Sequence, residues 1–206
     1  MNNYAIGNLK KYKIFLSGWE IAKNGRIMYT RACSVKGNRM IVLGIDPGLA
    51  TVGYGVVSCD EKTRLELIDY GTILTEAGEQ FPIRLKQISH GISQLYEMYK
   101  PDCVAFEELF FNKNVKTAIN VAQARGAALV AASEKTEELY EYTPLQIKQA
   151  VVGYGRADKN QVQMMVKTLL SLKEIPRPDD AADAVAVAIC HAHSARTAGI
   201  LNTKIK

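Results

Sequence analysis

The sequence lacks the features that mark several classes of protein. Its longest stretch without a charged residue runs from Pro47 to Cys59, 13 residues, whereas a membrane-spanning helix needs about 20. It holds no Gly-Lys-Ser or Gly-Lys-Thr triplet, which excludes a Walker-type nucleotide site. Cysteines are few and show no paired spacing, which excludes a zinc site or a disulfide framework and favours a reducing compartment. They are Cys33, Cys59, Cys103 and Cys190.

What the chain does have is enough length for one domain with a real core. It has 206 residues, of which 48% are hydrophobic and 23% charged. The net charge of +5 is unevenly spread, because residues 1–39 carry eight Lys or Arg and one acid, which leaves residues 40–206 with a net charge of −2. Binding of nucleic acid by the body must therefore depend on local basic patches, not on overall charge.

The first 39 residues differ from the rest of the chain. They show no sustained hydrophobic period, and they end where Met40 opens an apolar run. We expect residues 1–39 to be a basic N-terminal extension that is disordered or not part of the natural protein, and residues 40–206 to be the folded domain. A targeting peptide and a nucleic-acid-binding arm are the other interpretations of this segment.

The hydrophobic pattern of the body predicts an α/β fold. Strands are expected at 40–46, 51–58, 65–75, 102–107 and 139–142. Helices are expected at 82–99, 116–133, 158–172 and 181–194. The first three strands are joined by short links and should form an antiparallel meander, and the later strands alternate with helices. This order predicts a mixed sheet with helices on both faces.

Four acidic residues are candidates for the chemistry. Asp46 and Glu107 each end an expected strand, so they emerge at one edge of the sheet if those strands are parallel neighbours. Asp180 and Asp183 stand three residues apart at the start of the last helix and share one helix face. Clustered carboxylates repel one another, and Mg²⁺ or Mn²⁺ relieves that repulsion. Two such ions about 4 Å apart can activate water for phosphodiester cleavage.

Each acid also has a simpler interpretation. Asp46 precedes Pro47 and Gly48 and could be an ordinary turn residue. Glu107 beside Glu108 could be a solvated pair, and acids that open a helix are stabilised by its macrodipole. Only the joint placement of the four acids favours a metal site.

Five motifs, in order along the chain, carry a resemblance to a known family. They are Gly44-Ile45-Asp46-Pro47-Gly48, Phe106-Glu107-Glu108-Leu109-Phe110 with Asn112-Lys113-Asn114, Gln123-Ala124-Arg125-Gly126, Lys148-Gln149-Ala150-Val151-Val152-Gly153-Tyr154-Gly155, and Asp180-Ala181-Ala182-Asp183-Ala184. With them the chain resembles the RuvC-type Holliday junction resolvases from about residue 40 to residue 198. The N-terminal extension departs from the family pattern.

The resemblance implies an RNase H-like fold, with three antiparallel and two parallel strands in a five-stranded mixed sheet. It implies that Asp46, Glu107, Asp180 and Asp183 are the catalytic set and bind two Mg²⁺ ions, which Mn²⁺ can replace. It further implies a homodimer that nicks opposing strands of four-way junction DNA in recombination and repair. A junction-binding protein and a branch-migration motor are the implied partners, in the cytoplasm at the nucleoid and with no membrane.

The resemblance also assigns DNA contacts. Lys148 and Lys159 match catalytic lysines near the scissile phosphate, where an ammonium ion stabilises charge that develops in the transition state. Phe110 matches an aromatic residue that stacks on an unpaired base. Lys113 and Arg156 are expected to contact DNA, and Arg125 is a weaker candidate. The simpler interpretation of the lysines is a solvated helix face.

Two other functions stay open at this point. The first is an actin-like phosphotransferase or ATPase, whose phosphate loop can also read Gly-Ile-Asp-x-Gly. That class needs two such domains and a second Gly-rich phosphate loop, and the body of 167 residues has neither. The second is a non-catalytic junction-binding protein, which four clustered carboxylates argue against, because clustering is costly without a metal ion.

Overall fold

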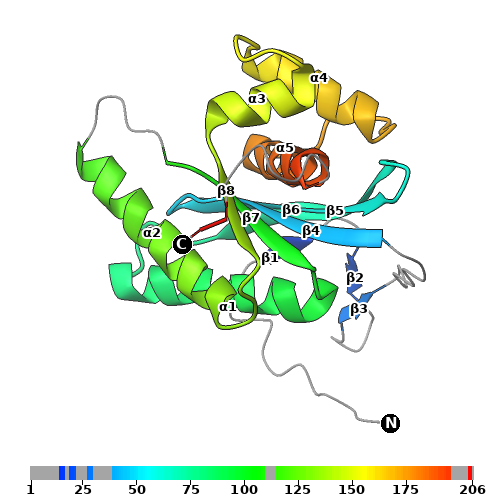
Figure 1. Cartoon of the computed structure of the whole chain (residues 1–206). Coiled ribbons are helices and arrows are strands. Elements are labelled where there is room, and N and C mark those ends of the chain that lie inside the picture. Colours follow the sequence, from blue (N-terminus) through cyan, green and yellow to red (C-terminus); the bar gives the residue numbers. More distant parts are fainter. Residues whose placement is uncertain are drawn as a thin grey trace.

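The computed structural model describes residues 14–16, 19–21, 27–29, 39–109, 115–195 and 204–205. At its centre lies a six-stranded sheet in the order β1-β6-β5-β4-β7-β8, with helices on both faces (Figure 1). The strands of this sheet are β1 (Ile14–Leu16), β4 (Arg39–Asp46), β5 (Thr51–Asp60), β6 (Leu65–Leu74), β7 (Cys103–Glu107) and β8 (Leu139–Tyr142). A separate antiparallel pair is formed by β2 (Trp19–Ile21) and β3 (Ile27–Tyr29).

The directions of the strands confirm the predicted mixed sheet. β4, β5 and β6 form an antiparallel meander, and β7 and β8 run parallel to β4. β1 adds a sixth strand from the extension, where Ile14 pairs with Ile73 on β6, and the prediction did not include it. That the extension is dispensable for the working protein stays a prediction.

Helices cover both faces of this sheet, so its central strands are buried on both sides. α1 (Phe81–Tyr99) and α2 (Val115–Ser133) cover one face. The other face carries α3 (Pro144–Val152), α4 (Lys159–Leu169) and α5 (Asp179–Ser194) (Figure 1). Burial on both sides explains why β5 reads as one apolar run and not as an alternating pattern. None of the helices in the described part of the chain has the length and apolar character of a membrane span.

One helix, α3, was missing from the prediction. Its N-terminal signal is a capping box: the side chain of Thr143 accepts a hydrogen bond from the Gln146 backbone N–H at 3.2 Å, and the Gln146 side chain accepts one from the Thr143 backbone N–H at 2.8 Å. Pro144 occupies the first turn, where its missing N–H costs nothing. Gly153, with φ of 93°, ends the helix in the left-handed conformation.

The close seat of α5 on β4 and β5 depends on glycine. A Cβ atom on Gly44 would lie 2.2 Å from the Ala184 carbonyl oxygen, and one on Gly53 would lie 2.0 Å from the Asp180 carbonyl oxygen. No residue with a side chain fits at either distance. These two positions therefore bring the backbone of α5 into direct contact with the strands and fix where its first turn lies.

Candidate active site

Asp46 and Glu107 meet at one edge of the sheet, on the face that α5 covers. The parallel register of β4 and β7 ends at the pair Ile45 and Phe106, so the two acids are the next residues on adjacent strands. Side chains alternate between faces along a strand. Gly44 packs against α5, and Ala105 belongs to the core on that side, so both acids face α5. The predicted parallel neighbourhood of these strands is confirmed.

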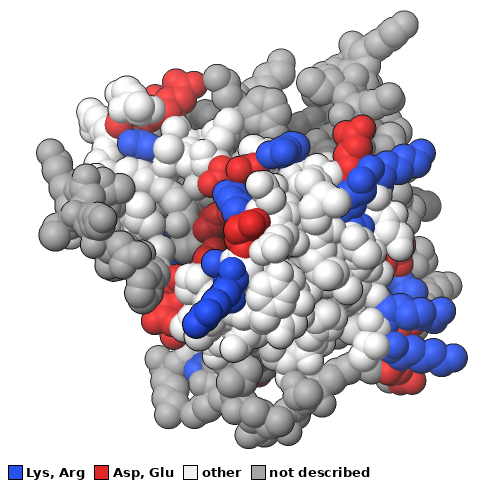
Figure 2. Space-filling model, turned by 90° about the horizontal axis from the view of Figure 1, so that it is seen from above, with Lys and Arg blue, Asp and Glu red and all other residues white. Residues whose placement is uncertain are grey.

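The first two turns of α5 add the other two predicted acids. Gly53 lies opposite Asp46 in the β4–β5 register, and the Asp180 backbone rests on Gly53. Asp180 is therefore next to the end of β4, and Asp183 follows one turn later on the same helix. On the face in Figure 2, acidic and basic side chains lie side by side near the centre. The structure thus brings all four predicted acids to one end of the sheet.

The titration of these acids reflects burial and mutual repulsion. Burial, followed by the charges of Glu107, Asp183 and Asp180, raises the pKa of Asp46 to about 8. Burial and the charge of Asp183 raise the pKa of Glu107 to about 7. The pKa of Asp183 is also raised, mainly by burial. Without a bound cation, nearby positive charge therefore does not fully offset the negative charge of these acids.

Two lysines supply part of that positive charge. The Lys159 ammonium group lies 2.9 Å from an Asp183 carboxylate oxygen and 3.4 Å from one of Asp179. Burial works to lower the pKa of Lys159, but its hydrogen bonds and ion pairs with Asp183 and Asp179 raise it overall. The charge of Lys148, on α3, lowers the pKa of Glu107 and so opposes the effect of burial. Both predicted lysines therefore act on the acidic cluster.

The donor set suits a hard divalent cation in kind, because all four predicted ligands are carboxylates. Among the residues that the structure describes, no three His, Cys, Asp or Glu side chains form a group that could hold a metal ion as they stand. Asp183 is instead paired with Lys159. The acids thus share one location and one electrostatic field, and they fit a metal ion by chemistry and charge without forming a closed ligand set.

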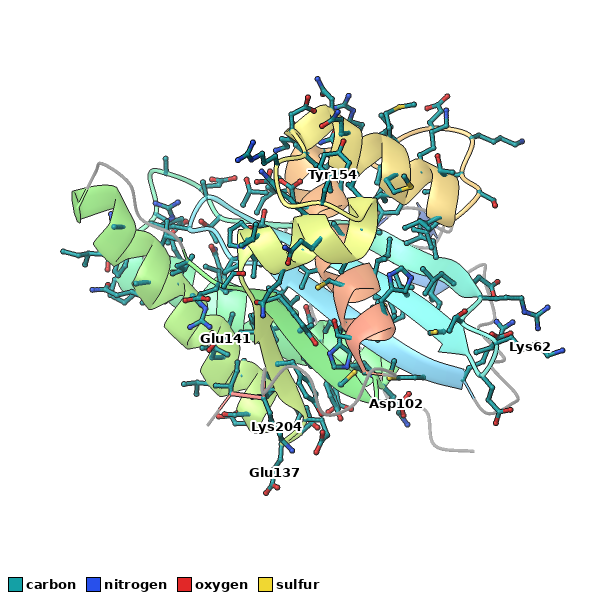
Figure 3. All side chains as sticks on the ribbon, turned by 45° about the horizontal axis from the view of Figure 1, so that its top comes forward. Lys62, Asp102, Glu137, Glu141, Tyr154 and Lys204 are labelled. Carbon is teal, nitrogen blue, oxygen red and sulfur yellow. The ribbon has the colours of Figure 1, made fainter. Side chains whose placement is uncertain are left out.

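Only some of the predicted DNA-contact residues lie in the part of the chain that the structure describes. Arg156 is exposed in the turn between α3 and α4, near Tyr154, which Figure 3 labels at the top of the molecule. Phe110 and Lys113 lie outside the described residues. Arg125 is engaged within the fold, because its guanidinium lies 2.5 Å from the Glu141 carboxylate and ties α2 to β8.

Asp179 is the residue that the prediction missed. It opens α5, pairs with Lys159 and accepts a hydrogen bond from the Arg177 guanidinium. The side chain of Gln163, which is buried on α4, lowers the pKa of Asp179, and the charges of Lys159 and Arg177 add to the effect. The only signal in the sequence is a third acid directly before Asp180, which by itself reads as a favourable residue at a helix N-terminus.

Comparisons with known proteins identify the family. The family model described as crossover junction endodeoxyribonuclease RuvC matches residues 42–191. The chain belongs to the RuvC family. The matched range of this RuvC family member contains all four acids and both lysines of the site.

Curated relatives in the RuvC family are similar over nearly their whole length. Crossover junction endodeoxyribonuclease RuvC of Alkaliphilus oremlandii is 57% identical over 155 residues, which is 75% of this chain and 94% of that protein. The protein of the same name from Alkaliphilus metalliredigens is 54% identical over 165 residues, 80% of this chain and 100% of that protein.

Solved RuvC structures share the fold. The structure of Thermus thermophilus RuvC has a TM-score of 0.72 and 40% identity, and the match covers 77% of this chain and 96% of that one. T. thermophilus RuvC in complex with a Holliday junction substrate has a TM-score of 0.71 and 37% identity, with coverage of 77% and 97%. The yeast mitochondrial Holliday junction resolvase Ydc2, at 16% identity and a TM-score of 0.58, shares the fold alone.

Proposed function

We propose that this protein is a structure-selective endodeoxyribonuclease that resolves four-way DNA junctions by paired nicks on opposing strands, in recombination and DNA repair. The observation that carries the proposal is the meeting of Asp46, Glu107 and the acidic start of α5 at one end of the sheet, in a chain of the RuvC family. An actin-like ATPase and a non-catalytic binding protein are not favoured.

The four acids are the proposed metal ligands. We expect Asp46, Glu107, Asp180 and Asp183 to hold two divalent ions, Mg²⁺ in the cell, with Mn²⁺ as a working replacement. Bound there, the ions supply an activated water and stabilise the leaving oxygen. The protein fixes where the reaction occurs, because its ligands come from strand ends and from a helix seated directly on those strands. This placement holds the ligands on rigid elements rather than on loops.

The lysines are the proposed phosphate contacts. Lys159 stands at the first residue of α4, where the Asp158–Gln161 capping box fixes the start of the helix. Its side chain is about half exposed, 52%, so it can reach a bound phosphate. Lys148 approaches the same cluster from α3, on the Glu107 side. Two cations on neighbouring elements favour a phosphate that enters above the acids and stabilise its developing charge. Arg156, with Phe110 and Lys113, is proposed to extend this contact along the DNA.

Paired nicks require two active sites. The described residues of one chain bring the predicted acids to a single place, so we propose that a homodimer presents one site to each of the opposing strands. A junction-binding protein and a branch-migration motor are the proposed partners. We place the enzyme in the cytoplasm at the nucleoid, where its DNA substrate lies. Residues 1–39 are proposed to be dispensable for this activity.

The test is cleavage of a mobile four-way junction in Mg²⁺, with products mapped on all four arms. We expect symmetric nicks on two opposing strands and no reaction in chelator. Glu107→Gln removes one ligand charge and keeps the size of the side chain, so cleavage should fall by at least about 10²-fold while junction binding persists. The matched control is Glu108→Gln, because Glu108 is the exposed neighbour on the same strand end. Equal cleavage by the two variants would remove Glu107 from the site.

A further inference from the structure

The Lys159 ammonium group is shared between two carboxylates that lie one turn apart on α5. Its Nζ is 2.9 Å from Asp183 Oδ2 and 3.4 Å from Asp179 Oδ2. Residues four apart on a helix lie on one face, so the two acids form adjacent positions on the face that Lys159 meets from the start of α4. The lysine can move between them by turning its flexible side chain.

Of these two partners, only Asp179 has no proposed role in metal binding. Asp183 belongs to the proposed metal-binding set, and a divalent cation on its carboxylate would repel the ammonium group and compete for the same oxygens. Asp179 lies at the rim of the cluster, because its side chain is 44% exposed against 27% for Asp183. Its carboxylate stays available to Lys159 when Asp183 does not.

Asp179 is itself held in place. The Arg177 guanidinium donates a hydrogen bond to Asp179 Oδ1, while Oδ2 is the oxygen nearest Lys159. One carboxylate oxygen thus accepts a bond from Arg177 and the other lies nearest the lysine, while the buried side chain of Gln163 on α4 also acts on this carboxylate. This division is typical of a residue that orients another side chain.

We infer that Asp179 is a positioning residue that keeps Lys159 over the acidic cluster when Asp183 is bound to metal. The inference rests on the proposed function, because it gives Lys159 a task at the scissile phosphate. Asp179 need not touch DNA or metal for this role. The long lysine side chain has many rotamers, and a retained ion pair limits them to those that point toward the phosphate.

Two simpler roles of Asp179 make different predictions. If it is only a surface acid beside the DNA path, its neutralisation reduces repulsion of the polyanion, so junction binding tightens and the rate does not fall. If it only stabilises the N-terminus of α5, its neutralisation lowers the melting temperature and leaves the rate of the folded enzyme unchanged. A positioning role lowers the rate constant for cleavage without weakening binding.

The experiment is single-turnover cleavage of a four-way junction in Mg²⁺ with saturating enzyme, together with junction affinity in Ca²⁺ and thermal melting. The variants are Asp179→Asn, Lys159→Ala, and the two combined. Glu174→Gln is the matched control, because it removes one exposed acid from the segment that leads into α5. We expect Asp179→Asn to cut the rate constant about three- to tenfold, with equal or tighter binding. Combined with Lys159→Ala, it should cause no further loss.

Three results would overturn the inference. They are a rate for Asp179→Asn equal to that of Glu174→Gln, a loss in the combined variant that is the product of the two single losses, and a loss explained by weaker binding. If the Lys159→Ala enzyme is slow while Asp179→Asn matches its control, the inference fails and the proposed function stands. If the unaltered protein does not cut junctions, the proposed function fails first, and the inference fails with it.

Discussion

Replacement of Gly53 by alanine would test how the active site is built. Gly53 lies opposite Asp46 in the sheet and directly under the first turn of α5. An added Cβ would stand 2.0 Å from the Asp180 carbonyl oxygen and 2.5 Å from its carbonyl carbon, where ordinary contact is 3.4–4 Å. Both neighbours are backbone atoms, so no side-chain rotation can relieve the clash. The first turn of α5 must withdraw, and Asp180 must move with it.

The size of the effect follows from these distances. To restore ordinary contact, the separation must grow from 2.0 Å to at least 3.4 Å, so the first turn of α5 must shift by about 1.4 Å or more, and overpacking of this kind costs about 1–3 kcal/mol of folding stability. In a domain of this size the melting temperature should fall by roughly 3–10 °C. A misplacement of about 1 Å in a catalytic group can cost about 10²-fold in rate. Cleavage should therefore fall about 10²-fold even at temperatures where the variant is still folded.

The assay is single-turnover junction cleavage at 25 °C, well below the melting transition of the variant, with binding measured in parallel. Gly78→Ala is the control, because an added Cβ there meets no atom within 4 Å. We expect Gly53→Ala to bind junctions and cut them about 10²-fold more slowly, and Gly78→Ala to match the unaltered protein. A folded Gly53→Ala variant that cuts at the normal rate would refute the reasoning. The contact between Gly53 and the first turn of α5 would then not determine the position of Asp180.

The remaining predictions concern acidity and the N-terminal extension. Without divalent ions, Asp46 in the folded protein keeps a proton at pH values where the unfolded chain has lost it, because its folded pKa is about 8 against an ordinary 3.8. The free energy of unfolding should thus fall as pH rises from about 4 to about 8, by at most about 1.4 kcal/mol per unit for this carboxyl, and the range from about 6.5 to about 8 separates this effect from the titration of histidine. His191, whose pKa burial lowers to about 4, stays neutral throughout this range. Asp46→Asn should flatten the slope of melting temperature against pH, and an equal slope in both proteins would contradict the assignment. Removal of residues 1–38, which keeps the Arg39–Glu66 ion pair, should leave the cleavage rate within about twofold; loss of folding would contradict it.

Much of the fold could be predicted because its elements are long or fully buried. β4, β5 and α1 have 8, 10 and 19 residues, and the apolar residues within them show their type clearly. α3 has nine residues, of which only Ile147 and Val151 are buried. Two buried positions four apart, among further apolar residues that are exposed or half-buried, do not show a clear period. Its capping box was the better signal, of the same kind as the one that marked the start of α4.

The sequence predicts the site residues that stand at the ends of strands. It does not predict contacts that depend on how the helices pack together. Asp46 and Glu107 follow buried strands, so they share an edge if those strands are parallel neighbours, and the β4–β7 pairing meets that condition. Asp179 and Lys159 open two different helices, twenty residues apart, and they meet only because α4 packs against α5. The packing of α5 against Gly53 could not be predicted for the same reason. A glycine in a strand does not show which backbone segment will pack on it.

The seat of α5 on β4 and β5 also has a consequence for synthesis of the protein. β4 is made early and α5 late, so a growing chain that stops before Asp179 carries only Asp46 and Glu107 of the four acids. Such a chain has no helix to complete the proposed ligand set. We expect truncated or ribosome-bound forms to be harmless to the chromosome, because the proposed ligand set is complete only once the last helix is made.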